Sequence, residues 1–282
     1  MAARAYGWGT RIELMPVLTR DTHPASPGEP RYTRLARVLF DPWSVEPEGV
    51  GALRAMLARK VIRAEYDERV KLTAAQIEAL HAVVHRYEGL ELHLLTDSAT
   101  LLFLGKFQEL ADSTVFNREA FATELGDWLL ANDSRSLVGM RGQEYGLGDD
   151  AARRVHLGLR RQLTLLPDEM AGFAKAGNLG MRSSSAVAVI TVEDDSVPHR
   201  VRVGQAYEET ALLLQQQHFC TAMHAGITEV EAPNLALRGR LRTRKRPTAV
   251  FRIGRPLREA DGHRPHASRP GLAAMLLPPD AV

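Results

Sequence analysis

The sequence predicts an α+β fold, because helix and strand patterns both recur along the chain. Thr73 is followed three residues later by Gln76, ahead of apolar residues at helical spacing, so the two can form a capping box at a helix start. Residues 116–130 carry apolar side chains at helical spacing and predict an amphipathic helix. Residues 186–192 are β-rich and apolar apart from Thr191, as expected of a central strand.

The other elements follow from local composition. Proline and glycine among polar residues mark loops at 19–31 and 41–51. Residues 131–185 are rich in Gly, Asp, Arg and Ser with weak periodicity, which predicts a surface excursion with short helices that could serve as a lid. We also predict strands at 35–40, 90–96 and 248–253, and helices at 52–61 and 204–219.

Bulk composition limits the class of protein. The 282 residues include 45% hydrophobic side chains, enough for one large domain or two small ones. A net charge of +2 makes nucleic-acid binding a disfavoured function. The single cysteine, Cys220, excludes an intramolecular disulfide framework. An apolar run of about eighteen residues is missing, and residues 1–14 lack the apolar stretch of a secretory signal, so we predict a cytoplasmic protein with no membrane association.

The segment from Arg59 to Asp67 is the most informative one. Arg59 and Arg63 lie four residues apart at the end of a predicted helix and would share one of its faces. Guanidinium groups match phosphate oxygens bidentately, so the pair could clamp a phosphate. The alternative is a solvated face in which Glu65 or Asp67 pairs with these arginines.

The order of several motifs resembles the nitroreductases. That family opens with an Arg-Arg-Ser-x-Arg/Lys-x-Phe motif and a Leu-Thr-x-x-Gln helix start, and Arg59, Arg63, Tyr66 and residues 72–76 stand in those places. Gly204-Gln205-Ala206 resembles the family's glycine-started helix, and residues 248–254 resemble its late strand. Ser268-Arg269-Pro270 resembles its C-terminal segment, and the whole order is most similar to the Acg-like, FMN-binding branch.

The resemblance implies a central, mostly antiparallel sheet packed by helices. It implies residues 1–48 as the remnant of a first half, with a strand and a flexible loop, and residues 49–282 as an FMN-binding domain. FMN would be held by Arg59, Lys60, Arg63 and Arg269, with backbone N–H groups near Gly226 facing flavin N5. The implied activity is hydride transfer from NAD(P)H or an organic substrate, with no catalytic side chain, in a homodimer with the flavin at its interface.

Two departures from the family pattern keep other functions open. Val61 replaces the hydroxyl residue of the first motif, and the Pro-Ser-x-x-Asn-x-Gln-Pro-Trp segment that reads the flavin pyrimidine does not occur. The pocket would then be completed by another subunit, by different residues, or not at all. The alternatives are a non-catalytic flavin-binding or flavin-sequestering protein, or a partner subunit of another nitroreductase-like protein.

Other constellations point more weakly to function. His81 and His85 have the spacing of a zinc pair but no evident third ligand, so we predict no metal site. A dyad of Cys220 with His218 or His224 is conceivable, but a buried inert thiol is favoured. The arginine-rich run 238–246 has no interleaved aromatic residue, and we interpret it as a solvated loop rim.

Overall fold

A computed structural model describes residues 2–14, 36–47, 49–136, 138–162 and 167–263. Its centre is a four-stranded sheet in the order β3-β6-β8-β7, with every neighbouring pair antiparallel. The strands are β3 (Leu90–Leu95), β6 (Ala186–Val192), β8 (Arg246–Gly254) and β7 (Cys220–Met223). The α+β class and the antiparallel sheet predicted from the sequence are both confirmed.

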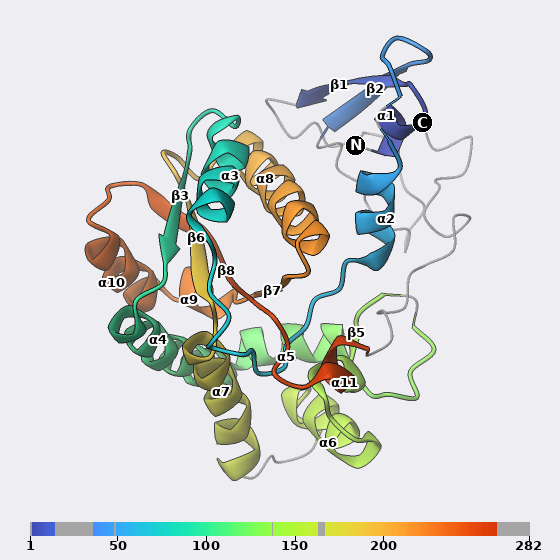
Figure 1. The fold of residues 1–282 in the computed structure, drawn as a ribbon. Coiled ribbons are helices and arrows are strands. Elements are labelled where there is room, and N and C mark those ends of the chain that lie inside the picture. The colour runs from blue at the N-terminus through green and yellow to red at the C-terminus, as the bar shows by residue number, and fades with distance from the viewer. Residues whose placement is uncertain (1, 15–35, 48, 137, 163–166, 264–282) are drawn as a thin grey trace.

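Alternation along β6 builds two apolar layers from one strand. Ala188 and Ile190 belong to a cluster with α3 (Ala74–His85) and α8 (Val197–Gln216). Val187 and Val189 belong to a second cluster on the opposite face, because successive side chains of a strand point to opposite sides. Figure 1 shows the sheet between the two sets of helices. The second set comprises α4 (Ser98–Asn117), α7 (Pro167–Arg182), α9 (Gly226–Glu229) and α10 (Glu231–Leu241).

The N-terminal residues form a small unit beside the main body (Figure 1). It contains α1 (Ala2–Ala5) and an antiparallel pair of β1 (Gly9–Leu14) and β2 (Ala36–Asp41). The predicted strand at 35–40 corresponds to β2, whereas β1 was not predicted. The helix α2 (Gly51–Ala58) follows and packs against α8. The predicted loop at 19–31 lies outside the described residues.

Residues 119–159 form a helical excursion below the sheet. It holds α5 (Glu119–Trp128), β4 (Leu129–Leu130), β5 (Met140–Arg141), the 3-10 helix η1 (Gly142–Tyr145) and α6 (Asp149–Leu159). The short strands β4 and β5 pair in parallel. A last short helix, α11 (Glu259–Gly262), follows β8.

Several predicted bounds were wrong. The helix predicted at 116–130 is α5 preceded by the end of α4, with a break at Arg118, and α4 itself was missed. The surface excursion predicted to reach residue 185 includes α7, which packs along α4 and buries Ala174 and Met181 in the core. The helix predicted to start at Gly204 starts at Val197, so this glycine lies inside α8. Within the described residues, none of the helices has the length and apolar character needed to cross a membrane.

Candidate functional site

The predicted phosphate-binding segment is extended rather than helical. Because α2 ends at Ala58, Arg59 and Arg63 do not share a helix face, and that prediction was wrong. The chain instead runs alongside β7: Val61 forms a parallel bridge with Thr221, and the Ile62 N–H donates to the Thr221 carbonyl over 3.2 Å. The segment therefore extends the sheet by a short bridge at its β7 edge.

Arg59 is already engaged by an acidic partner. Its Nε donates to Oε1 of Glu208 on α8 over 3.0 Å, and 22% of its side chain is exposed. The alternative to a phosphate clamp was a solvated face on which the arginines pair with Glu65 or Asp67. Arg59 does have a carboxylate partner, but that partner is Glu208. Asp67 pairs instead with Arg69 over 2.8 Å. An anion at Arg59 would have to compete with Glu208.

Lys60 lies on the other side of the segment. Its Nζ donates to the Gly262 carbonyl over 3.3 Å, and its charge acts on the nearby thiol of Cys220. Burial nevertheless raises the pKa of Cys220, which keeps the thiol protonated. His218 is exposed, so the structure favours the inert thiol over a nucleophilic dyad.

Arg63 has weaker partners than Arg59. Its Nη2 contacts the sulfur of Met140 over 3.6 Å, and its guanidinium lies over the Tyr145 ring at 4.3 Å. A thioether is a weak acceptor and an aromatic face supplies no lone pair, so most donors of this half-buried arginine remain available. Among the described residues, Arg63 forms no ion pair with a carboxylate. These properties suit an anionic ligand group.

A buried arginine fixes the backbone beneath Arg63. Arg252 on β8 donates to the carbonyls of Ala64 over 2.8 Å, Ile62 over 3.4 Å and Gly180 over 3.3 Å. Its guanidinium also lies 4.2 Å from the centre of the Tyr66 ring. Arg252 could not be identified from the sequence, because a single arginine within an apolar strand carries no pattern.

His224 follows β7 and adds a third basic group to this region. Burial, with the charges of Arg252 and Arg63, lowers the pKa of His224 to about 3, so its ring is neutral. Its Nε2 is buried without a hydrogen-bond partner among the described residues. A buried nitrogen without a partner is costly in free energy. A polar ligand group could therefore be accommodated here.

Gly226 opens α9 and borders a buried carboxyl group. A Cβ atom at this position would lie 2.9 Å from Oδ1 of Asp112 on α4, so a side chain would displace the carboxyl. Burial raises the pKa of Asp112 to about 7, against the opposing hydrogen bond from Gln108. Asp112 also acts on the pKa of Tyr145, the residue stacked on Arg63.

The structure thus gathers part of the predicted set. The charges of Arg63 and Arg252 act on His224, two residues before Gly226, while Arg59 reaches α8 and Lys60 reaches Gly262. Arg269 lies outside the described residues. Sequence reasoning had considered His224 only as a dyad partner and missed Asp112, Tyr145 and Arg252.

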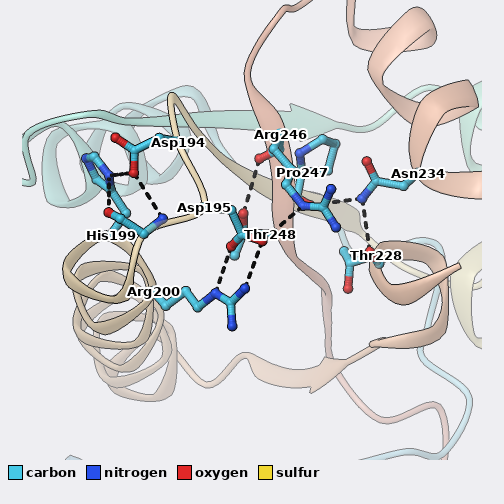
Figure 2. Close-up of polar contacts among 10 residues, drawn as sticks. Asp194, Asp195, His199, Arg200, Thr228, Asn234, Arg246, Pro247 and Thr248 are labelled. Carbon is cyan, nitrogen blue, oxygen red and sulfur yellow. Dashed lines mark hydrogen bonds and ion pairs between the residues drawn. The ribbon is translucent and has the colours of Figure 1, made fainter. Parts of the chain in front are cut away.

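The other candidate motifs have ordinary surroundings. His81 and His85 are exposed on α3, and no three His, Cys, Asp or Glu side chains of the described residues are grouped so that they could hold a metal ion. The arginine-rich run is a loop only in part, because Arg238 and Arg240 lie on α10 and Arg246 opens β8. Two of its cations pair with carboxylates: Arg246 meets Asp195 at 3.5 Å and Lys245 meets Glu91 at 3.5 Å. Figure 2 shows Asp195 between Arg246 and Arg200.

Comparison with known proteins defines the fold. No protein-family model matches the sequence, and no curated protein matches it. Among solved structures, the FMN- and NADPH-dependent nitroreductase NfnB from Sphigopyxis sp. strain HMH is 16% identical, with 80% of this chain and 97% of that chain covered and a TM-score of 0.50. A mutant of that enzyme gives a TM-score of 0.52 at 14% identity, with 81% and 98% covered.

The FMN-dependent nitroreductase NfnB from Mycobacterium smegmatis, solved in complex with NADPH, is 12% identical. The match covers 80% of this chain and 97% of that chain, with a TM-score of 0.51. The chain therefore has the nitroreductase fold, as the sequence motifs predicted.

Proposed function

We propose that the protein is an FMN-dependent oxidoreductase of nitroreductase type that acts on a small-molecule substrate. The observation that carries the proposal is Arg63, a half-buried cation with no carboxylate partner among the described residues, beside the β7–α9 turn of a nitroreductase fold. Bound FMN would supply hydride chemistry through N5, with NAD(P)H or an organic substrate as the donor.

The chain's own residues would bind and orient. Arg63 and Lys60 would hold the phosphate and the polar tail of FMN, and Arg252 would keep the segment under Arg63 in place through its bonds to the Ile62 and Ala64 carbonyls. Gly226 would present its backbone N–H to the flavin edge. Arg59 would join the phosphate site only after release from Glu208. Arg269 keeps the role that the family resemblance implies for it.

Spectroscopy of the purified protein tests this proposal. Reconstitution with FMN should give flavin absorbance bands, and these should bleach on addition of NADPH or NADH under anaerobic conditions. An apoprotein that takes up no FMN from a stoichiometric mixture would show that the proposal is wrong.

A second candidate is a non-catalytic flavin-binding or flavin-sequestering protein, or a partner subunit of another nitroreductase-like protein. The ion pair between Arg59 and Glu208 favours it, because this pair occupies a cation that the family resemblance assigns to FMN. Under this alternative, bound FMN would give the flavin bands but would not bleach with either nicotinamide. Homodimer formation and cytoplasmic localisation stay predictions under both candidates.

A further inference from the structure

Asp112 is a carboxyl group placed where apolar packing is expected. It lies on α4 beside Ala111 and near Val115, two residues of a buried apolar cluster. Its carboxyl accepts a single hydrogen bond in the described part of the chain, from Gln108 Nε2 to Oδ1 over 2.7 Å. Gln108 is itself only 2% exposed, and its Oε1 has no partner.

Two glycines make room for this carboxyl. A Cβ at Gly177 of α7 would lie 2.6 Å from Asp112 Oδ2, and one at Gly226 of α9 would lie 2.9 Å from Oδ1. At either distance a Cβ atom would displace the Asp112 carboxyl from its observed position. The helices α7 and α9 thus each present a glycine to Asp112, which leaves room for its carboxyl in the observed position.

The described neighbours of Asp112 supply no positive charge that would stabilise an ionised carboxylate. The helices α7 and α9 contribute glycine contacts, and α4 contributes the uncharged Gln108. From η1 the titratable neighbour is Tyr145, whose own pKa also responds to Arg63 and Glu144. No cation among the described residues pairs with Asp112. An ionised carboxylate in such surroundings is costly, and a proton removes that cost.

A proton on Asp112 would also provide a hydrogen-bond donor for Gln108. The site contains more acceptors than donors, because Gln108 donates to Asp112 while its own Oε1 has no donor. A protonated carboxyl gains one O–H donor. The raised pKa of Asp112, about 7, agrees with this geometry.

We propose that Asp112 is a proton-holding positioning residue of the candidate flavin site, whose uncharged form admits an anionic ligand at Arg63. The inference rests on the proposed function, since it takes the FMN phosphate or ring edge as that anion. The link runs through Gly226, which the proposed function places at the flavin edge and where a Cβ would lie 2.9 Å from Asp112 Oδ1. Tyr145, which stacks on the Arg63 guanidinium, is the second neighbour, and the Asp112 charge contributes to the raised pKa of this tyrosine. An anion bound nearby favours the protonated carboxyl, so FMN binding takes up a proton near neutral pH.

Isothermal calorimetry with FMN tests the coupling. Titrations of the apoprotein between about pH 7 and 8.5, in buffers of different ionisation heat, give the protons exchanged on binding. The wild type should take up a fraction of a proton more than Asp112→Asn, at most about one half at pH 7, where the free carboxyl is already half protonated. Its affinity should fall more steeply with pH than that of the variant, by less than about tenfold per unit. The difference between the two proteins cancels the titration of the FMN phosphate itself. Equal proton uptake in both would overturn the inference.

Glu109→Gln is the matched control. It removes a carboxyl one helix turn from Asp112 that accepts from Asn178. This variant should keep the wild-type proton uptake, and a loss equal to that of Asp112→Asn would also overturn the inference.

A measurement without FMN tests the protonation state of Asp112 separately from the proposed FMN-dependent function. Carbon-13 NMR of aspartate-labelled wild-type protein should show one carboxyl that titrates near pH 7 and is absent from Asp112→Asn. If FMN binds neither protein, the proposed function fails, while this titration still decides the state of Asp112. A carboxyl that titrates near the ordinary value of about 4 would overturn the inference even if FMN binds.

Discussion

Arg63 and Arg59 carry the same charge four residues apart, yet their surroundings differ. Arg63 contacts a thioether and an aromatic face, whereas Arg59 has a carboxylate partner in Glu208. An anion can therefore bind Arg63 without breaking an existing ion pair. At Arg59 a bond to the anion must replace the bond to Glu208, so the net gain in binding free energy is smaller.

The first prediction follows from this difference. Arg63→Ala should weaken FMN binding by about 1.5 to 3 kcal/mol, the range for a hydrogen bond to a charged group. Arg59→Ala should weaken it less, and Glu208→Gln should increase the contribution of Arg59 by releasing its guanidinium. Arg269→Ala is expected to weaken binding through the same phosphate. Fluorescence titration of the apoproteins measures each affinity, and wild-type affinity in Arg63→Ala would exclude this arginine from the site.

A second prediction concerns the pH dependence of stability at Asp112. Its pKa is raised from 3.8 to about 7 in the folded protein. The stability conferred by the protonated group is therefore complete below about 4 and is lost as pH rises through about 7. Asp112→Asn does not titrate, so its advantage over the wild type should grow across this interval. We expect about 2 kcal/mol at pH 8.5, less than the full shift implies because solvent reaches part of the residue.

Urea unfolding of both proteins at pH 5.5 and 8.5 checks this prediction. The difference in unfolding free energy between variant and wild type should be larger at the higher pH. A difference that is the same at both values would mean that Asp112 is already ionised at pH 5.5 in the folded state.

At the scale of elements, the start of α3 rests on a local device. The Thr73 hydroxyl accepts from the Gln76 N–H over 3.2 Å, and the Gln76 side chain accepts from the Thr73 N–H over 2.8 Å. Thr73→Ala should therefore destabilise the protein by about 1 kcal/mol, the usual value of an N-cap. Thr73→Ser keeps the hydroxyl and is the control, with nearly wild-type stability expected. Thermal denaturation distinguishes the two variants, and equal melting temperatures would contradict the prediction.

Elements with local signals could be predicted from the sequence. The capping box located α3, and the largely apolar run located β6 with its observed bounds. By contrast, α7 was assigned to a surface excursion with short helices, because residues 131–185 are rich in Gly, Asp, Arg and Ser with weak periodicity. In the structure these glycines allow close packing, since Gly177 lies against Asp112 and Gly180 against the Arg252 guanidinium. Glycine in a sequence is equally consistent with a loop and with close packing against another element. Which of the two applies depends on the residue that the fold brings next to the glycine.

The candidate site was predictable only in part for a related reason. Arg63 belongs to a motif, so the order of motifs could find it. Arg252, His224 and Asp112 are single polar residues from three separate elements, and each acquires a role only when the fold brings the elements together. The polar Gln108 and Asp112 also interrupt the apolar face of α4, which explains why that helix was missed.

At the scale of the whole molecule, the described part of the chain leaves apolar surface of the N-terminal strand pair exposed. The register of β1 and β2 places Ile12 opposite Val38 and Thr10 opposite Phe40, on one face. Ile12, Val38 and Phe40 are 46%, 47% and 58% exposed in the part of the chain that the structure describes. Contiguous exposed apolar surface of this kind marks an interaction site more often than an isolated apolar residue does.

We therefore predict a homodimer, with any flavin at its interface, contacted by Arg63 of one chain and by residues of the other. Association would bury apolar area at roughly 25 cal/mol per Å², and a two-fold dimer is the commonest closed arrangement. Light scattering should give twice the 31.2 kDa of one chain. If the strand pair takes part, Val38→Lys should shift the protein toward monomer, whereas Leu110→Lys, an equally exposed position on α4, should not. A monomer that binds FMN stoichiometrically would contradict the prediction, because one chain would then complete the pocket by itself.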